Sequence, residues 1–350
     1  MVARLGVIGA AVTAALSVVV AGPASAAGTG TYRQVNLVSD QPGVAALTDP
    51  SLVNAWGLSH GPNTPIWASD NGADVTTLYR TDVAGSPATK VLQVAIPGGA
   101  PTGQVFNSTS SFVVPGTVNP ARFVFAGENG DLSAWNGGGS AVRGHHSDTA
   151  VYKGLALVQG SSGPLLLAAD FHDNRIDVFD GTFTLVSTAG MFHDRFLPAG
   201  YAPFDVAEID GQVFVTYAKQ DAARHDDVAG KAHGFVDVYT NDGGFVRRFA
   251  THGVLDSPWG ITLAPATFGQ FGGDVLIGNF GDGRIHAFDP RTGAVVGVLR
   301  GPSGGPLVID GLWGLTVGDQ VAGGVDSVWF SAGPDGEQHG LLGLLQPHRG

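Results

Sequence analysis

The sequence of 350 residues contains no cysteine, and this absence excludes disulfide bonds, thiol nucleophiles and cysteine-ligated metal sites. Positive charge is also scarce, because 18 Lys and Arg residues stand against 30 Asp and Glu residues and give a formal net charge of −12 at pH 7. The chain has neither a basic stripe nor a basic aromatic face. We therefore expect it to bind neither nucleic acid nor an anionic membrane surface.

Several catalytic motifs are missing as well. The sequence has no Gly-x-Ser-x-Gly elbow, no phosphate-binding P-loop and no His-Glu-x-x-His helix. Its glycine-rich stretches join strand-like runs to one another rather than strands to helices, which argues against a dinucleotide site. We predict no nucleotide cofactor and no serine-based nucleophile.

Glycine is abundant, with 54 residues, while the apolar fraction is an ordinary 43%, so the glycines indicate turns and close packing rather than disorder. The clearest unit of the chain is Ser257–Asp289. It contains an apolar run at Trp259–Leu263, a strand-like run at Asp274–Gly278, a tight turn at Asn279–Gly283 and an alternating segment at Arg284–Asp289. This pattern predicts three short strands in succession.

The same unit occurs six times along the sequence. Its equivalent positions lie between 46 and 55 residues apart and are Gly57, Gly103, Gly154, Asp205, Gly260 and Gly314. A β-rich repeat of this length is typical of propeller blades. The sequence therefore predicts an all-β fold, a six-bladed β-propeller.

A propeller must join its last blade to its first. The sixth unit has three recognisable strands, and an alternating run, Tyr32–Ser39, stands before the first unit. We predict that Tyr32–Ser39 pairs beside the Gly340–Gln346 strand as the outermost strand of the last blade. This pairing would also protect two exposed strand edges.

The first residues have the pattern of a secretory signal. Within Met1–Ala26, the apolar run Leu5–Val20 is followed by Ala24-Ser25-Ala26, which fits the small-residue rule for cleavage. A membrane anchor is the alternative, but the apolar run is short for a span. We predict a secreted, extracellular monomer in which residues 27–350 form a single propeller. The sequence ends without a hydrophobic sorting segment, so we expect release rather than anchoring.

Three Trp-Gly pairs recur at the starts of the units, Trp56-Gly57, Trp259-Gly260 and Trp313-Gly314. They could form a stacking platform for sugars. We favour a packing role, in which each Gly lets the blades converge on the axis and each Trp wedges between adjacent sheets.

Polar residues at the unit starts and at the ends of the second strands should share one mouth of the channel. Carboxylate and amide oxygens there suit a divalent cation, Ca²⁺ or Mg²⁺. The predicted metal ligands are Asp70, Glu128, Asp170 and Asn279. The predicted proton carriers are His172, His225 and Lys219. The predicted substrate contacts are Asn54, Gln104, Asn107, Tyr152, Lys153, Asp205, Tyr217, Asp226 and Asp227. The alternative is a water-filled polar channel without catalysis.

One segment does not fit the short connections of the repeat. Lys219–His233 is a charged insertion between the second and third strands of the fourth unit, and it includes His225-Asp226-Asp227. We expect it to lie over the same mouth. Long loops of this kind are often lids or binding elements, and a solvated surface loop is the alternative.

The segments NAWGLS, PTGQVFN, FAGENGDLSAW, SPWGI and VLIGNFGDGRIHAFD together resemble a largely uncharacterised family of secreted bacterial six-bladed propeller proteins. The resemblance covers the whole mature chain and implies an exported propeller, but no established activity. More distantly, the blade pattern is similar to NHL-repeat, streptogramin lyase and gluconolactonase propellers. In those enzymes a divalent cation lies at the channel mouth.

Two functions stay open at this point. The first is a cation-assisted lyase or hydrolase that acts on a small molecule or polysaccharide at the mouth. The second is a non-catalytic propeller that binds a glycan or protein with the same rim. Carboxylates gathered around one cation-sized gap would favour the enzyme, and their dispersal would favour binding.

Overall fold

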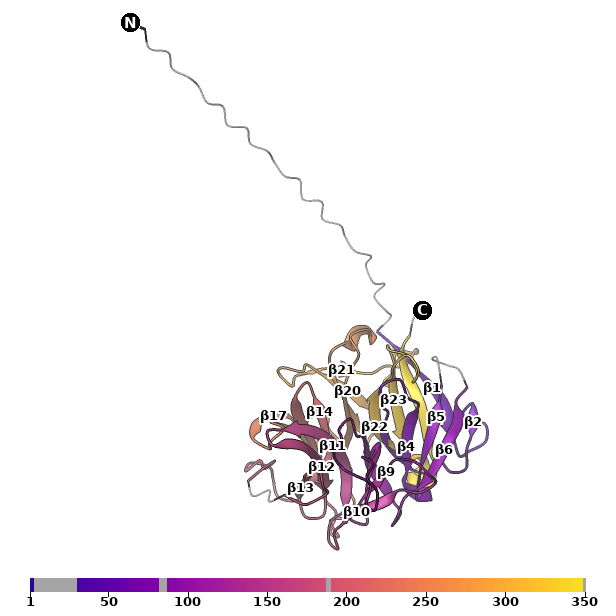
Figure 1. The fold of residues 1–350 in the computed structure, drawn as a ribbon. Coiled ribbons are helices and arrows are strands. Elements are labelled where there is room, and N and C mark those ends of the chain that lie inside the picture. Colours follow the sequence, from indigo (N-terminus) through magenta and orange to yellow (C-terminus); the bar gives the residue numbers. More distant parts are fainter. Residues whose placement is uncertain (3–29, 82–86, 187–189, 349–350) are drawn as a thin grey trace.

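The structure is a computed structural model that describes residues 1–2, 30–81, 87–186 and 190–348. Six mainly antiparallel sheets make up the fold, and the innermost strand of each sheet lines a central channel. The predicted six-bladed β-propeller is therefore confirmed (Figure 1). The predicted signal segment lies outside the described residues from position 3 onward. Within the described part, no helix is both long and apolar enough to cross a membrane.

The strands of each blade follow the chain from the channel outward. Blade 1 contains β3 (Ala55–Ser59), β4 (Ile66–Asp70), β5 (Val75–Arg80) and β6 (Thr89–Ala95). Blade 2 contains β7 (Pro101–Phe106), β8 (Phe123–Gly127), β9 (Asp131–Trp135) and β10 (Val142–His146). Blade 3 contains β11 (Tyr152–Gly160), β12 (Gly163–Asp170) and β13 (Arg175–Phe179).

The second half of the chain continues this order. Blade 4 contains β14 (Tyr201–Ile209), β15 (Gln212–Lys219), β16 (Phe235–Tyr239) and β17 (Phe245–Thr251). Blade 5 contains β18 (Pro258–Leu263), β19 (Val275–Asn279), β20 (Ile285–Phe288) and β21 (Val295–Val298). Blade 6 contains β22 (Leu312–Val317), β23 (Val328–Ala332) and β24 (Leu341–Pro347). The short helices are η1 (Asn71–Ala73), η2 (Gly269–Phe271) and α1 (Pro334–Glu337).

The N-terminal strand closes the ring, as predicted. β1 (Tyr32–Ser39) pairs antiparallel with β24, with a register that runs from Tyr32 opposite Pro347 to Ser39 opposite Leu341 (Figure 1). One detail of the prediction was wrong, because β1 is not the outermost strand. The chain turns back after Ser39, and β2 (Leu47–Thr48) adds a short parallel strand outside β1.

Aromatic side chains pack in two different places. Trp67 lies between blades 1 and 2. Its ring centroid is 4.8 Å from that of Phe123 and 5.0 Å from that of Trp135. The tryptophans of the Trp-Gly pairs do not wedge between sheets, which corrects the predicted placement. They meet one another in a buried group that we call the axial aromatic cluster, formed by Trp56, Phe171, Phe204, Trp259, Trp313 and Phe280. The ring centroids of Trp56 and Trp313 are 3.6 Å apart.

The glycines near the starts of the inner strands allow these strands to converge, as predicted. A Cβ added at Gly103 would lie 2.5 Å from the backbone nitrogen of Leu155 and 2.7 Å from the carbonyl carbon of Gly154. A Cβ added at Gly314 would lie 2.6 Å from the carbonyl oxygen of Trp56. These neighbours are backbone atoms of the next blade, so a side chain would push adjacent inner strands apart.

We expect Gly103→Ala to lower the free energy of unfolding by about 1–3 kcal/mol, because overpacking a closed core forces backbone shifts. The measurement is urea unfolding followed by tryptophan fluorescence. Gly139→Ala is the matched control, since an added Cβ at Gly139 meets nothing within 4 Å. Equal stabilities of the two variants would contradict the role assigned to the inner-strand glycines.

Candidate functional site

The inner strands begin at one mouth of the channel, which we call the first mouth, and end at the other, the second mouth. At the first mouth the end of each second strand pairs with the start of the inner strand. Asp70 lies opposite Ala55 in blade 1, and Asp170 lies opposite Tyr152 in blade 3. The turns after the second strands therefore surround this mouth, which is where the sequence places most of the candidate residues.

Lys153 is the centre of the first mouth. It follows the start of β11, its side chain is 1% exposed, and its Nζ lies 5.0 Å from the ring centroid of Trp56 and 6.0 Å from that of Phe171. Blades 1, 5 and 6 have tryptophan at the equivalent position, and blade 4 has Phe204. Lys153 thus replaces an aromatic residue of the repeat and puts a cation against the axial aromatic cluster at a cation–π distance.

Two carboxylates neutralise this ammonium. Glu128, in the turn after β8, forms an ion pair with Lys153, and Asp226 lies 3.4 Å from Lys153 Nζ. Asp226 belongs to the charged insertion of blade 4. The insertion therefore reaches over the first mouth, as its position in the sequence predicted.

An amide network links these acids to the ring. Asn54 Nδ2 donates to Glu337 Oε2 at 2.7 Å and to Asn71 Oδ1 at 3.2 Å, and Trp313 Nε1 donates to Asn54 Oδ1 at 3.1 Å. Asn71 Nδ2 donates to Glu128 Oε2 at 3.0 Å. Burial raises the pKa of the Glu337 carboxyl, and the nearby charge of Glu128 adds to this effect. Asn71 and Glu337 were not predicted, although both lie in turns after second strands.

One group at this mouth has the spacing of metal ligands. Ligand atoms of Glu128, His225 and Asp226 all lie within 4.8 Å of one another. His225 Nδ1 lies 2.9 Å from Asp226 Oδ1. One ligand comes from blade 2 and two come from the insertion, so the group exists because the loop folds over the mouth.

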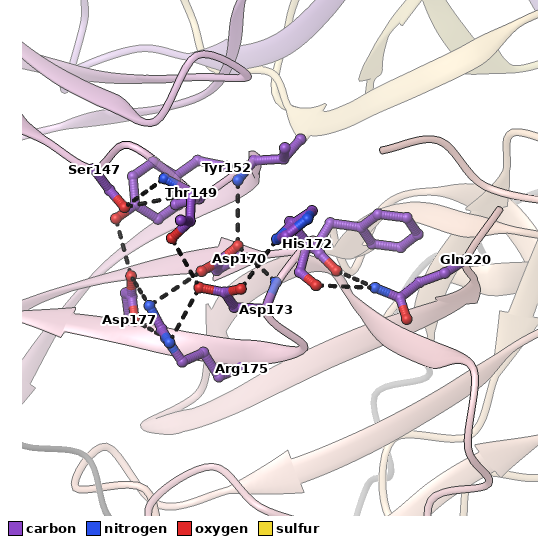
Figure 2. Close-up of polar contacts among 12 residues, drawn as sticks. Ser147, Thr149, Tyr152, Asp170, His172, Asp173, Arg175, Asp177 and Gln220 are labelled. Carbon is purple, nitrogen blue, oxygen red and sulfur yellow. Dashed lines mark hydrogen bonds and ion pairs between the residues drawn. The ribbon is translucent and has the colours of Figure 1, made fainter. Parts of the chain in front are cut away.

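The other predicted metal ligands are not in this group. Asp170 accepts hydrogen bonds from the backbone of Val151 at 3.2 Å and of Asp173 at 3.1 Å, and it lies 3.4 Å from the guanidinium of Arg175 (Figure 2). These contacts fix the turn after β12 to the start of β11, the inner strand of the same blade. Burial raises the pKa of Asp170 to about 6.

Further candidates also have structural partners. Tyr152 donates to Asp177 Oδ2 at 2.9 Å, and His172 Nδ1 lies 3.0 Å from Asp173 (Figure 2). Tyr217 shares a 2.7 Å hydrogen bond with the buried hydroxyl of Tyr239. Asn279 Nδ2 donates to the carbonyl oxygen of Val254 at 2.8 Å.

Of four more candidates, two hold loops in place and two are buried acids. Asn107 Nδ2 donates to the carbonyls of Ser111 and Ala121, both at 2.9 Å. The carbonyl oxygen of Lys219 accepts a hydrogen bond from Val228, which shapes the insertion. Burial raises the pKa of Asp227 and, much more strongly, that of Asp70, whose side chain is fully enclosed. The four predicted metal ligands are thus held in four separate blades.

Gln104 and Asp205 lie deeper in the channel. They line a cavity of about 590 Å³ that follows the inner strands to their last residues and opens at the second mouth. Trp259 of the axial aromatic cluster also lines this cavity, whereas Trp56 and Phe171 of the same cluster face Lys153. The cluster therefore separates the first mouth from the cavity.

No family model matches this chain. Two uncharacterised proteins of Acanthamoeba polyphaga mimivirus are each 32% identical to it. One alignment covers 90% of this chain and 80% of the relative, and the other covers 90% and 86%. The chain belongs to their family. These relatives are viral, so the bacterial origin and the secretion implied by the resemblance stay predictions.

Solved structures agree with the fold. A catalytically inactive virginiamycin B lyase from Staphylococcus aureus, with quinupristin, aligns with a TM-score of 0.52 over 90% of this chain and 99% of that chain, at 10% identity. An α-L-arabinanase from Penicillium chrysogenum, complexed with arabinobiose, aligns with a TM-score of 0.54 over 89% and 97%, at 12% identity. At such low identity the comparison supports the propeller fold and no more.

We expect Lys153→Met to lower the free energy of unfolding by about 3 kcal/mol, because it leaves Glu128 and Asp226 close together without their shared cation. Amide hydrogen exchange in residues 220–228 should rise as the insertion loses its contact with blade 3. Urea unfolding and exchange measured by mass spectrometry test both effects. Lys231→Met, in an exposed part of the insertion, is the control. Unchanged exchange in 220–228 would show that Lys153 does not hold the insertion.

Proposed function

We propose that this protein is a divalent-cation-assisted lyase or hydrolase that acts on a small molecule or polysaccharide at the first mouth. The observation that carries the proposal is the group of Glu128, His225 and Asp226, whose ligand atoms lie within 4.8 Å of one another. The ligands come from separate chain segments that meet only in the folded propeller. Together with the predicted signal segment, the proposal makes the protein an extracellular enzyme.

The chemistry of these ligands narrows the choice of cation. Two carboxylates and an imidazole suit Mn²⁺ or Zn²⁺ better than Ca²⁺, which prefers oxygen ligands alone. This ligand set differs from the predicted one because it includes a nitrogen ligand. In place of Ca²⁺ or Mg²⁺, we therefore propose Mn²⁺ or Zn²⁺ as the bound cation. A bound divalent cation would supply Lewis-acid activation of a substrate oxygen.

Lys153 is the residue placed to move a proton. Its Nζ contacts both Glu128 and Asp226, so a cation on these carboxylates competes directly with the ammonium. Its side chain is enclosed by the axial aromatic cluster on the other side, which keeps water from surrounding the amine. In this proposal Lys153 takes the proton-carrying role that the sequence assigned to His172 and Lys219, while His225 becomes a ligand.

One observation favours the alternative, a non-catalytic propeller that binds a glycan or protein. The ammonium of Lys153 already compensates the carboxylates of Glu128 and Asp226. The first mouth could then act as a polar recognition surface, with the amide network of Asn54 and Asn71 as its hydrogen-bonding edge. The two functions differ in whether a divalent cation displaces Lys153.

We expect isothermal titration of chelator-treated protein to detect one site for Mn²⁺ or Zn²⁺. Glu128→Gln and Asp226→Asn should each weaken it at least tenfold, because each removes one anionic ligand. Asp148→Asn is the matched control, since the Asp148 side chain is 96% exposed and lies outside the ligand group. A stoichiometric site that depends on Glu128 would justify a search for turnover among lactones and glycans.

Absence of binding for Mn²⁺, Zn²⁺, Ca²⁺ and Mg²⁺ would overturn the cation-assisted enzyme and leave the recognition propeller. A site that survives both Glu128→Gln and Asp226→Asn would place the cation elsewhere. Direct binding of a glycan array to the metal-free protein, lost in Lys153→Met, would support recognition instead of catalysis.

A further inference from the structure

The channel cavity is a second candidate site, separate from the first mouth. It has a volume of about 590 Å³, within the range of roughly 300–1,000 Å³ that holds small ligands. Its walls come from all six inner strands and combine polar groups with apolar side chains such as Leu58, Leu155, Ile261 and Leu315. The described residues that line it include three carboxylic acids and one histidine but neither lysine nor arginine. Its charge therefore disfavours an anionic ligand.

Asp205 lies where the repeat otherwise has glycine. Five of the six inner strands have Gly at the equivalent position, and blade 4 has Asp205. A Cβ added at Gly154, on the adjacent strand, would meet Asp205 Oδ1 and would lie 2.6 Å from its Cα. The carboxyl group thus fits against β11 only because that neighbour is glycine. Propeller packing alone does not require an acid at this position.

Most buried acids have a cation beside them, but Asp205 and Asp70 have no ion pair with any described residue, and of these two only Asp205 lines the cavity. Asp131 lies 2.8 Å from the guanidinium of Arg143, Asp177 lies 2.6 Å from that of Arg175, and Asp237 is paired with Arg248. Asp205 is 9% exposed and has no ion pair with any described residue. Burial raises the pKa of its carboxyl well above the usual range, and only the backbone N–H of Val206 opposes this effect.

Further polar atoms around the cavity also lack partners. Gln104 Oε1 and Trp259 Nε1 are buried and have no hydrogen-bond partner in the described part of the chain, and both residues line the cavity. Gln104 is fixed in place because its Nε2 donates to the carbonyls of Gly57 at 2.6 Å and Trp67 at 3.0 Å. Both atoms are themselves enclosed by protein, so they do not face a ligand in the cavity.

We propose that this cavity binds a small organic cation, with its ammonium group on the Asp205 carboxylate and its apolar part along the channel wall. Glu208 and Asp210, on the lining toward the second mouth, favour the approach of a cation. This site goes beyond the proposed function, because it lies on the other side of the axial aromatic cluster from the divalent-cation ligands.

The test compares three probes of the same shape at pH 7: hexylammonium, 1-hexanol and hexanoate. Binding is measured by NMR titration of the isotope-labelled full chain. We expect hexylammonium to bind at least tenfold more tightly than 1-hexanol, and hexanoate to bind more weakly than either. Asp205→Asn and Asp205→Gly should remove the advantage of hexylammonium and leave the affinity for 1-hexanol unchanged.

Asp205→Gly keeps the experiment informative if Asp205→Asn does not fold, because it gives blade 4 the residue of the other five blades. Asp148→Asn controls for the loss of one negative charge at an exposed site. Equal affinities for hexylammonium and 1-hexanol in the unmodified protein, selectivity that survives Asp205→Gly, or no binding of any probe would each overturn the proposal. The probes contain no metal, so this result and the divalent-cation titration can fail independently.

Discussion

The close approach of six strand backbones at the channel axis is the constraint on which the rest of the structure depends. At Gly103 and Gly314 the next inner strand is so near that a single added carbon would overlap backbone atoms. The axial aromatic cluster, which includes Trp313 before Gly314, fills the space on the axis. It lies between the first mouth and the cavity, so the two ends of the channel form separate compartments. The first mouth is charged and covered by a loop, while the cavity has both polar and apolar walls and contains the buried carboxyl group of Asp205.

The two compartments arise from two departures from the repeat on adjacent strands. Lys153 stands where four of the other five blades have an aromatic residue, and Asp205 stands where the other five have glycine. Lys153 has its counter-charges within the protein, in Glu128 and Asp226. Asp205 has none among the described residues. Several buried acids that support the blades have an arginine beside them, as in the pair of Asp177 and Arg175. Asp70 is also buried without a cation, so Asp205 is distinguished by its position on the wall of the cavity.

The fold could be predicted from the sequence, because strand periodicity and a repeat near 50 residues are visible in a single chain. It also predicted the pairing of Tyr32–Ser39 with the last blade and the position of the insertion over the first mouth. It did not distinguish Asp170, which bonds to the turn of its own blade, from Glu128, which faces Lys153. Both are acids at the point where a second strand passes into a turn that contains Asn. Only side-chain direction separates them, and that depends on packing between blades. The role of Glu337 was missed for the same reason.

Ring closure has a consequence for how the molecule forms. β1 pairs with β24, so the contacts that complete the last blade join residues more than 300 positions apart, as between Arg33 and Gln346. Contacts of such long sequence separation form slowly, because the intervening chain must first be ordered. During synthesis the first strand has no partner until the last one emerges, so five blades can assemble while the sixth is still open. The ring therefore closes only after the whole chain has been synthesised. An incomplete chain would leave two unpaired strand edges that invite association with other chains.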